Sequence, residues 1–195
     1  GMVARGRPKK FNNFEALEKA MEVFWDKGYE SASLPDLIEA MGISRQSMYN
    51  TFGNKRDLFL QTLEYYTFKG GQQLADQFNG PGHAEDKING FIEMMTGAFC
   101  NQGGKGCFAS GAIHEMAAKD ADVKRILDAK YDKNSALFED FYTKAIDSGE
   151  ITSDLDGKQL ADLFDSILLG VTGLCKLPNR CEQIQNVFKI FINYI

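Results

Sequence analysis

Apolar residues recur at helical spacing along almost the whole chain, whereas alternating runs of β-branched residues bounded by turns are nearly absent. The first apolar stripe begins after a candidate N-cap at Asn12 or Asn13 and ends at Gly28. Its members are Phe14, Leu17, Met21, Phe24 and Trp25. The pattern predicts an all-α protein whose first helix occupies this stripe.

Caps and glycine breaks divide the rest of the chain into further helices. Ser33 with Asp36 and Asn54 with Asp57 have the spacing of helix N-caps, and Ser44 can cap a short helix that follows Gly42. The predicted helices after the first cover residues 34–41, 45–51, 55–78, 84–100, 107–118 and 122–148, with two more before the end of the chain. The total is about nine helices.

The last two predicted helices are apolar beyond a single face. Their apolar residues keep the i, i+3, i+4, i+7 spacing, and Leu169 and Ile190 lie off the stripe. A helix that is apolar on several sides is covered on several sides, so a second copy of the chain is expected to cover part of this surface. Burial within one monomer is the alternative. The residues predicted for the dimer interface are Phe164, Leu168, Val171, Phe188 and Phe191.

Residues 33–55 have the pattern of a helix-turn-helix, in which the second helix enters the major groove of DNA. Arg45, Gln46 and Ser47 occupy the first turn of that helix, where side chains reach base edges. The residues beyond the first turn that suit phosphate oxygens are Tyr49, Asn50, Thr51 and Lys55. Met48 and Phe52 are four apart and are predicted to anchor the helix from inside.

The charge distribution is compatible with DNA binding although the net charge is −5. Residues 1–60 hold nine Lys or Arg against eight Asp or Glu, and the remainder holds thirteen against nineteen. Most of the negative charge therefore lies outside the first third. A basic arm of Arg5, Arg7, Lys9 and Lys10 precedes the first helix and suits phosphate contacts, although a solvated tail explains it equally well.

Residues from about Phe11 to Leu60 resemble the DNA-binding domain of the TetR-like repressor family. The resemblance lies in the glycine-tyrosine pair at 28–29, the IEAMGIS run at 38–44, the MYNTF run at 48–52, Asn54-Lys55 and Leu58-Phe59. It implies a domain of residues 1–58 that binds double-stranded operator DNA and a helical domain of residues 59–195 that binds a small effector and forms a homodimer. Arg45-Gln46 departs from the smaller or less polar residues frequent in the family.

The resemblance also implies roles for particular residues. The positions of Tyr49 and Lys55 hold the DNA backbone in the family, and the last two helices form a four-helix bundle with their counterparts. The body encloses an effector pocket, for which the candidates among the middle helices are Met95, Phe99, Cys107, His114, Tyr131, Asn134 and Phe138. For most of these, plain core packing is the alternative, and a surface position is the alternative for His114 and Asn134.

Cys107 lies at a glycine-rich entry to a predicted helix, and a helix N-terminus favours the thiolate. The segment 106–115 is similar to one in a branch of the family in which some members respond to electrophiles through a cysteine. A buried cysteine that only fills space is the alternative.

Other classes of function find little support in the sequence. The spacing of Cys100, Cys107 and His114 does not suit a metal site, because Cys107 and His114 on one helix lie about 10 Å apart. No nucleophile and base pair is evident, so we expect no enzyme, cofactor or metal. The four cysteines are expected to be reduced thiols in a soluble, cytoplasmic protein without a membrane span. The alternative function is that of a helix-turn-helix activator or an architectural DNA-binding protein that has no small-molecule ligand.

Overall fold

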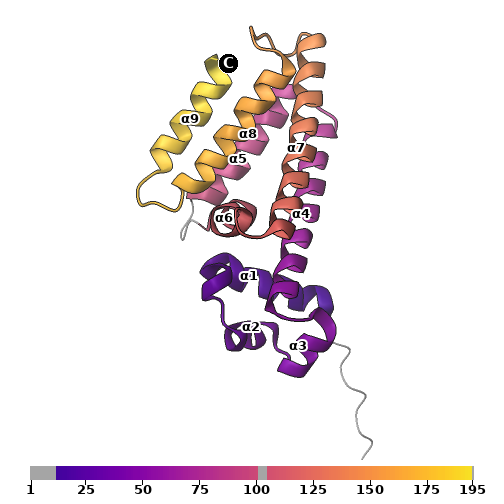
Figure 1. Cartoon of the computed structure of the whole chain (residues 1–195). Coiled ribbons are helices and arrows are strands. Elements are labelled where there is room, and N and C mark those ends of the chain that lie inside the picture. Colours follow the sequence, from indigo (N-terminus) through magenta and orange to yellow (C-terminus); the bar gives the residue numbers. More distant parts are fainter. Residues whose placement is uncertain (1–11, 101–104, 195) are drawn as a thin grey trace, which may run out of the picture. The chain divides into compact units, whose positions relative to one another are not determined.

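The computed structural model describes residues 12–100 and 105–194 of the chain. All regular structure in these ranges is helical, which confirms the all-α prediction (Figure 1). The chain separates into two compact units, one up to Thr62 and one from Leu63 on. The basic arm at residues 5–10 lies outside the described ranges. Within them, no helix is both long enough and apolar enough to span a membrane.

The first unit contains α1 (Asn13–Ser31), α2 (Leu34–Met41), α3 (Arg45–Phe52) and the beginning of α4 (Lys55–Asn79). Side chains cap the helices as their spacing predicts. The Asn12 side chain accepts hydrogen bonds from the first turn of α1, and Ser33 and Asp36 form a reciprocal capping box at the start of α2. Gly42 ends α2 in the left-handed conformation with φ +68°, which a residue without a Cβ adopts at low cost.

Gly28 interrupts α1 where the sequence predicts a stop. Its backbone is non-helical with φ +78° and ψ 171°, and a short helical stretch follows it up to Ser31. The interior face of α1 consists of Ala16, Leu17, Ala20 and Phe24, whereas Phe14 is 70% exposed. Small alanines allow close helix packing, and a search for large apolar residues overlooks them.

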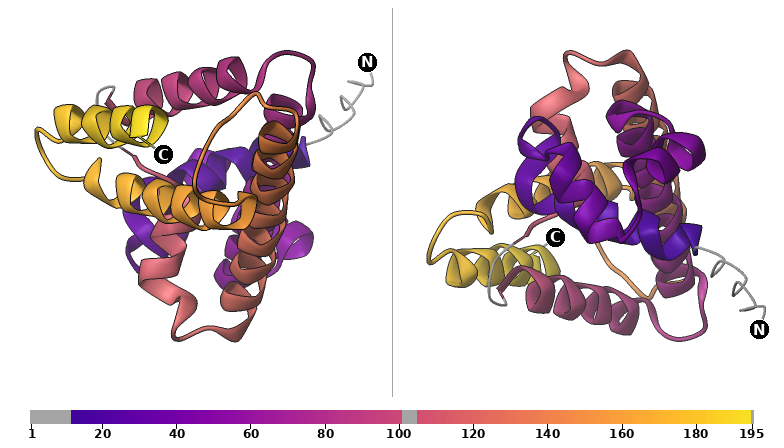
Figure 2. Two further views of the ribbon diagram at one scale, coloured as in Figure 1. Left: turned by 90° about the horizontal axis from the view of Figure 1, so that it is seen from above. Right: turned by 90° about the horizontal axis from the view of Figure 1, so that it is seen from below.

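The second unit contains the rest of α4, then α5 (Ala84–Cys100), α6 (Phe108–Ala112), α7 (Ala121–Asp147), α8 (Gly157–Leu174) and α9 (Cys181–Tyr194). A π-helical turn, η1 (Ile113–Ala117), continues α6, where a single helix over 107–118 was predicted. Helix α7 packs along α8, and α9 lies between α5 and α8 (Figure 2).

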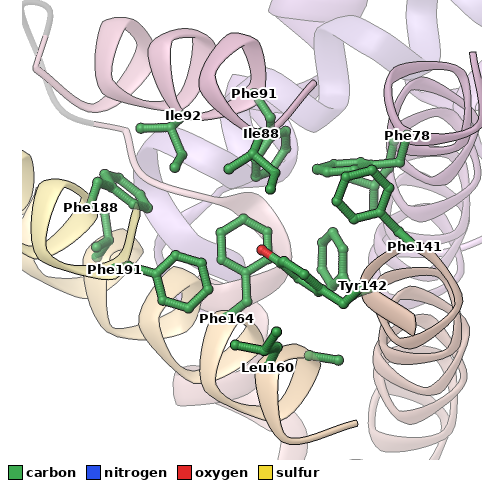
Figure 3. Packing of buried hydrophobic residues seen from close by; sticks show 14 of the residues in the cluster. Phe78, Ile88, Phe91, Ile92, Phe141, Tyr142, Leu160, Phe164, Phe188 and Phe191 are labelled. Atoms are coloured by element: carbon green, nitrogen blue, oxygen red, sulfur yellow. The ribbon is translucent and has the colours of Figure 1, made fainter. Parts of the chain in front are cut away.

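An aromatic core joins the helices of the second unit (Figure 3). Phe164 of α8 is fully buried at its centre, with the ring of Phe138 from α7 at 4.9 Å and the ring of Phe191 from α9 at 5.2 Å between centroids. Phe91 of α5 lies at 5.7 Å from the same ring. One side chain thus links α8 to three other helices.

Four of the five residues predicted for the dimer interface belong to this core instead. Phe164, Val171, Phe188 and Phe191 are at most 5% exposed within a single chain, and only Leu168 is half-buried. Side chains that are already covered within one chain cannot form the surface that a second chain covers. The stripe was identified correctly as apolar, but its regular spacing marks the inner faces of α8 and α9.

The expectation of four reduced thiols is also corrected. Cys100 at the end of α5 and Cys181 at the start of α9 form a disulfide with their Cα atoms 5.3 Å apart, while Cys107 and Cys175 are free. The two cysteines are separated by 81 residues in sequence, and the packing of α5 against α9 brings them together.

Candidate nucleic-acid interface and thiol site

Helix α3 is held by its inner face and its cap. Met48 is fully buried and Phe52 is 6% exposed, so the prediction that these two residues anchor the helix is confirmed. The Ser44 side chain accepts a hydrogen bond from the backbone amide of Ser47 and fixes the N-terminus of the helix. With α3 anchored in this way, its opposite face is free to meet another molecule.

The polar residues of α3 predicted to meet DNA lie on this outer face. Arg45, Gln46, Asn50 and Thr51 are exposed, and Tyr49 is 43% exposed. Ser47 is half-buried, and its hydroxyl accepts a hydrogen bond from the cap residue Ser44.

Gln46 and Asn50 are already ordered with respect to each other. The Gln46 Nε2 group donates to the Asn50 Oδ1 atom at 2.9 Å across one helical turn. Both amides keep further donors and acceptors, which can bond to the edges of bases. The Gln46 and Asn50 side chains are therefore oriented by each other in the absence of DNA.

Lys55 is the first residue of α4 and is held by the end of α1. Its Nζ atom lies 4.6 Å from the centroid of the Tyr29 ring and donates to the backbone oxygen of Glu30 at 3.4 Å. The Tyr29 ring in turn packs at 5.0 Å from that of Phe59. Contacts with α1 therefore hold the ammonium group at the junction of α1 and α4.

The second candidate site surrounds Cys107, which immediately precedes α6. The Cys107 Sγ atom lies 3.2 Å from the hydroxyl oxygen of Tyr66 on α4. Ser110, one turn further along, accepts a hydrogen bond from the Thr172 hydroxyl of α8 at 2.9 Å, and both of these residues are buried. The thiol therefore lies among hydroxyl groups contributed by three helices.

The environment favours the thiolate form of Cys107. Burial raises the pKa of the thiol, but the positive charge of Lys130, the Tyr66 hydroxyl and interactions with Ser110 outweigh it, so the pKa of Cys107 lies below its ordinary value. Burial, together with the charge of Cys107, raises the pKa of Tyr66 well above its usual range. Either atom can donate in the hydrogen bond between them, and once the thiol is ionised the Tyr66 hydroxyl is the donor and the sulfur the acceptor.

The helix N-terminus was expected to lower the pKa of Cys107, whereas Lys130 and Tyr66 lower it more than the backbone amide of Ser110 does. Tyr66, Ser110 and Lys130 were absent from the predicted site. Tyr66 is 41 residues from Cys107, and only the packing of α4 against the start of α6 brings them together. Lys130 lies with its Nζ atom 4.4 Å from the centroid of the Tyr131 ring.

The structure gathers only part of the predicted effector set around this thiol. Tyr131 belongs here, because the charge of Cys107 and interactions with Ser110 influence its pKa, which burial raises. Asn134 is half-buried and His114 is exposed. The remaining members pack in or against the aromatic core: Met95, Phe99 and Phe138.

Comparison with known proteins adds to this geometry. Residues 16–62 match the model of the bacterial regulatory proteins of the tetR family. Residues 84–191 match the model of the tetracyclin repressor-like C-terminal domain. The two matches fall in the two compact units and together cover most of the chain.

Individual relatives match along nearly their whole length. The uncharacterized HTH-type transcriptional regulator YezE of Bacillus subtilis is 29% identical over 93% of this chain and 94% of its own. The HTH-type transcriptional repressor ComR of Escherichia coli is 29% identical over 94% of this chain and 89% of its own. A cysteine mutant of the TetR family transcriptional regulator CifR, complexed with 26bp double-strand operator DNA, is 29% identical with a TM-score of 0.80, covering 96% of this chain and 99% of that one.

Proposed function

Because the chain belongs to the tetR family of bacterial regulatory proteins, we propose that it represses transcription by binding a palindromic operator as a homodimer, and that a small, largely apolar effector releases it. The family consists of DNA-binding regulators, not enzymes. The observation that carries the proposal is the anchored α3, which presents Arg45, Gln46 and Asn50 on one exposed face. The relative CifR, in the form complexed with operator DNA, has the same fold.

A homodimer explains how an eight-residue helix achieves specificity. Two copies related by a two-fold axis place two α3 helices in successive major grooves, roughly 34 Å apart or somewhat more. The operator is then an inverted repeat, and the contacts of one half-site are doubled.

The dimer surface proposed here is the outer side of α8 and α9. On α8, one side carries Leu163, Ile167, Gly170 and Leu174, which are half-buried or exposed in the single chain. On α9, Ile190 is 55% exposed. These apolar positions lie beside the inward stripe, so a second chain can cover them without disturbing the core.

The residues of the DNA-binding unit are expected to divide into two kinds. Gln46→Ala removes a base contact, so it lowers affinity for the operator by about 1–3 kcal/mol and relaxes the preference at one base pair. Lys55→Ala removes a phosphate contact, so it weakens binding to all sequences alike and reduces the salt slope by about 1. Tyr49→Phe is expected to resemble Lys55→Ala in kind. Competition binding with an operator library at several salt concentrations measures both effects.

Lys19→Ala is the matched control, since Lys19 is an exposed lysine on α1 of the same unit. It should leave the affinity, the base preference and the salt slope close to those of the unmodified protein. A Lys55→Ala variant that changes the preferred sequence and keeps its salt slope would contradict the assignment.

The effector is proposed to act at Cys107. The Cys107 thiolate adds to the carbon–carbon double bond of a neutral, electron-poor alkene with an apolar body. A carbon–sulfur bond forms, the π bond of the alkene breaks, and the neighbouring carbon takes up a proton from water. The sulfur then loses the hydrogen bond that it accepts from Tyr66. Tyr66 lies on α4, which begins at Lys55 in the DNA-binding unit, so a change at the thiol acts on the same helix that holds the phosphate contact.

Alkylation with N-ethylmaleimide is expected to lower operator affinity by about 5- to 150-fold, the usual range of coupling between two sites. Cys107→Ser should retain operator binding and lose this response. Cys175→Ser is the matched control, because Cys175 is the other free cysteine and should leave the response intact. Operator titrations before and after alkylation, with mass spectrometry to locate the adduct, measure the effect.

Tyr66→Phe tests whether the Tyr66 hydroxyl increases the reactivity of the Cys107 thiol. Loss of the donated hydrogen bond raises the pKa of Cys107, so the alkylation rate at pH 7 should fall about tenfold and the rate profile should move to higher pH. Unchanged operator affinity with Cys107 fully modified, or an equal loss in Cys107→Ser, would eliminate the thiol as sensor. Reversible ligand binding would remain possible in that case.

A further inference from the structure

A cavity of about 210 Å³ lies away from Cys107, where the beginnings of α5 and α8 meet the ends of α7 and α9. Buried side chains form its inner end, and exposed residues form its mouth. The buried residues of the lining are Ile88, Tyr142, Leu160 and Phe191, Ile151 is partly buried, and the exposed ones are Glu85, Asn89, Glu150, Thr152 and Ile192. A space of this size has room for one small organic molecule.

The inner end of the cavity carries a buried hydroxyl group, that of Tyr142. Tyr142 is 2% exposed, and its hydroxyl oxygen has no hydrogen-bond partner in the described part of the chain. In Figure 3 the hydroxyl points away from α7 toward the space between Ile88 and Phe191, two of the apolar residues that line the cavity. Buried polar groups nearly always find partners, so this one indicates a missing acceptor.

Tyr142 is surrounded by packed rings that hold it in this direction. The ring of Phe141 lies 5.3 Å away, that of Phe164 6.1 Å and that of Phe191 6.4 Å between centroids. Burial, with a smaller contribution from the charge of Asp165, raises the pKa of the Tyr142 phenol well above its ordinary value. The hydroxyl therefore keeps its proton near neutral pH and is available as a donor.

The charges around the cavity exclude an anionic ligand. Glu85 and Glu150 are the titratable residues at the mouth, and among the described residues that line the cavity none is basic. Glu150 is already occupied: it accepts from the Ala84 backbone amide at 3.0 Å and from the Ser148 hydroxyl at 3.1 Å, and it faces the His83 Nδ1 atom at 3.6 Å. These contacts, led by the one with Ala84, lower the pKa of Glu150, so its charge persists.

A cation is disfavoured for a different reason. The carboxylates of the lining, Glu85 and Glu150, are exposed at its mouth, so a cation at the buried inner end would have no counter-charge and would be costly to bury. A neutral molecule meets neither obstacle. It needs only an apolar body to fill the walls and one acceptor atom at the inner end.

We propose that this cavity binds a small neutral organic molecule with an apolar body and one hydrogen-bond acceptor, a hydroxyl, carbonyl or ether oxygen, to which the Tyr142 hydroxyl donates. The site shares no residue with the surroundings of Cys107 and goes beyond the proposed function. Its failure would leave the operator and the thiol response untouched.

Benzyl alcohol is the probe, with toluene, benzylamine and benzoate as matched compounds of the same ring size. The full-length protein with labelled isoleucine methyl groups is titrated by NMR. We expect benzyl alcohol to shift the Ile88 and Ile151 methyl signals in a saturable way and to leave Ile38 of the DNA-binding unit unchanged. Toluene should bind more weakly, and benzoate should cause no saturable shift.

Tyr142→Phe removes only the hydroxyl and should weaken benzyl alcohol about 3- to 10-fold while leaving toluene unchanged. Tyr65→Phe, the same substitution on α4 outside the cavity, should change neither. Equal benzyl alcohol binding by the Tyr142→Phe and unmodified proteins would overturn the proposal, as would the absence of saturable shifts at Ile88 and Ile151. Benzylamine that binds more tightly than benzyl alcohol, and equally to the Tyr142→Phe and unmodified proteins, would show that the carboxylates at the mouth recognise the ligand. That result would also overturn the proposal.

Discussion

Replacing Phe164 with alanine is expected to lower the free energy of unfolding by about 3–5 kcal/mol. The side chain is fully buried, and its ring lies within 6 Å of rings from α5, α7 and α9. Its removal leaves a cavity lined by α5, α7, α8 and α9. These helices cannot close the cavity without breaking the remaining contacts between their aromatic rings.

Urea denaturation at a fixed protein concentration measures the change, because the proposed dimerisation would make the apparent stability depend on concentration. Phe68→Ala is the matched control: Phe68 is 63% exposed on α4, so the same substitution should change the free energy of unfolding by no more than about 0.5 kcal/mol. If both variants lost the same amount, Phe164 would not have the central place in the core that the structure gives it.

Ile190→Asp is expected to turn the proposed dimer into monomers while the fold remains intact. Ile190 is 55% exposed in the single chain, so an aspartate is harmless there until a second chain covers it. Each covered carboxylate costs about 2 kcal/mol or more. A two-fold interface contains the position twice, so the dissociation constant should rise about a thousandfold and operator affinity should fall with it.

Sedimentation equilibrium measures the association, and circular dichroism checks the helices. Gln185→Asp is the matched control, since it places the same charge at an exposed position on another side of α9. A dimeric Ile190→Asp protein would move the interface to other residues. Monomers from Gln185→Asp would show that any added charge on α9 disturbs the fold.

Local features of this chain were predictable from its sequence. The caps at Asn12, Ser33 and Ser44 and the buried pair Met48 and Phe52 depend on neighbours within one helical turn, and the structure has them where the spacing places them. The outward face of α3 follows from the same periodicity, because fixing the inner residues of a helix also fixes its outer ones.

Features that depend on which helices pack together were not predictable. The apolar spacing of α8 and α9 identifies a buried stripe, but periodicity does not say whether the same chain or a second copy covers it. Phe188 and Phe191 are covered by their own chain. The pairing of Cys100 with Cys181 and the contact of Tyr66 with Cys107 also join segments far apart in sequence, for which helical rhythm gives no signal.

The central claim is that two copies of the chain read a two-fold symmetric operator through α3. Selection of bound fragments from the genome of the source organism, followed by footprinting and measurement of protein stoichiometry at several salt concentrations, tests it most directly. We expect an inverted repeat protected by two chains or a multiple of two, with half-sites one helical turn or somewhat more apart and binding that weakens steeply with salt. A single asymmetric half-site bound by one chain at low salt would contradict it.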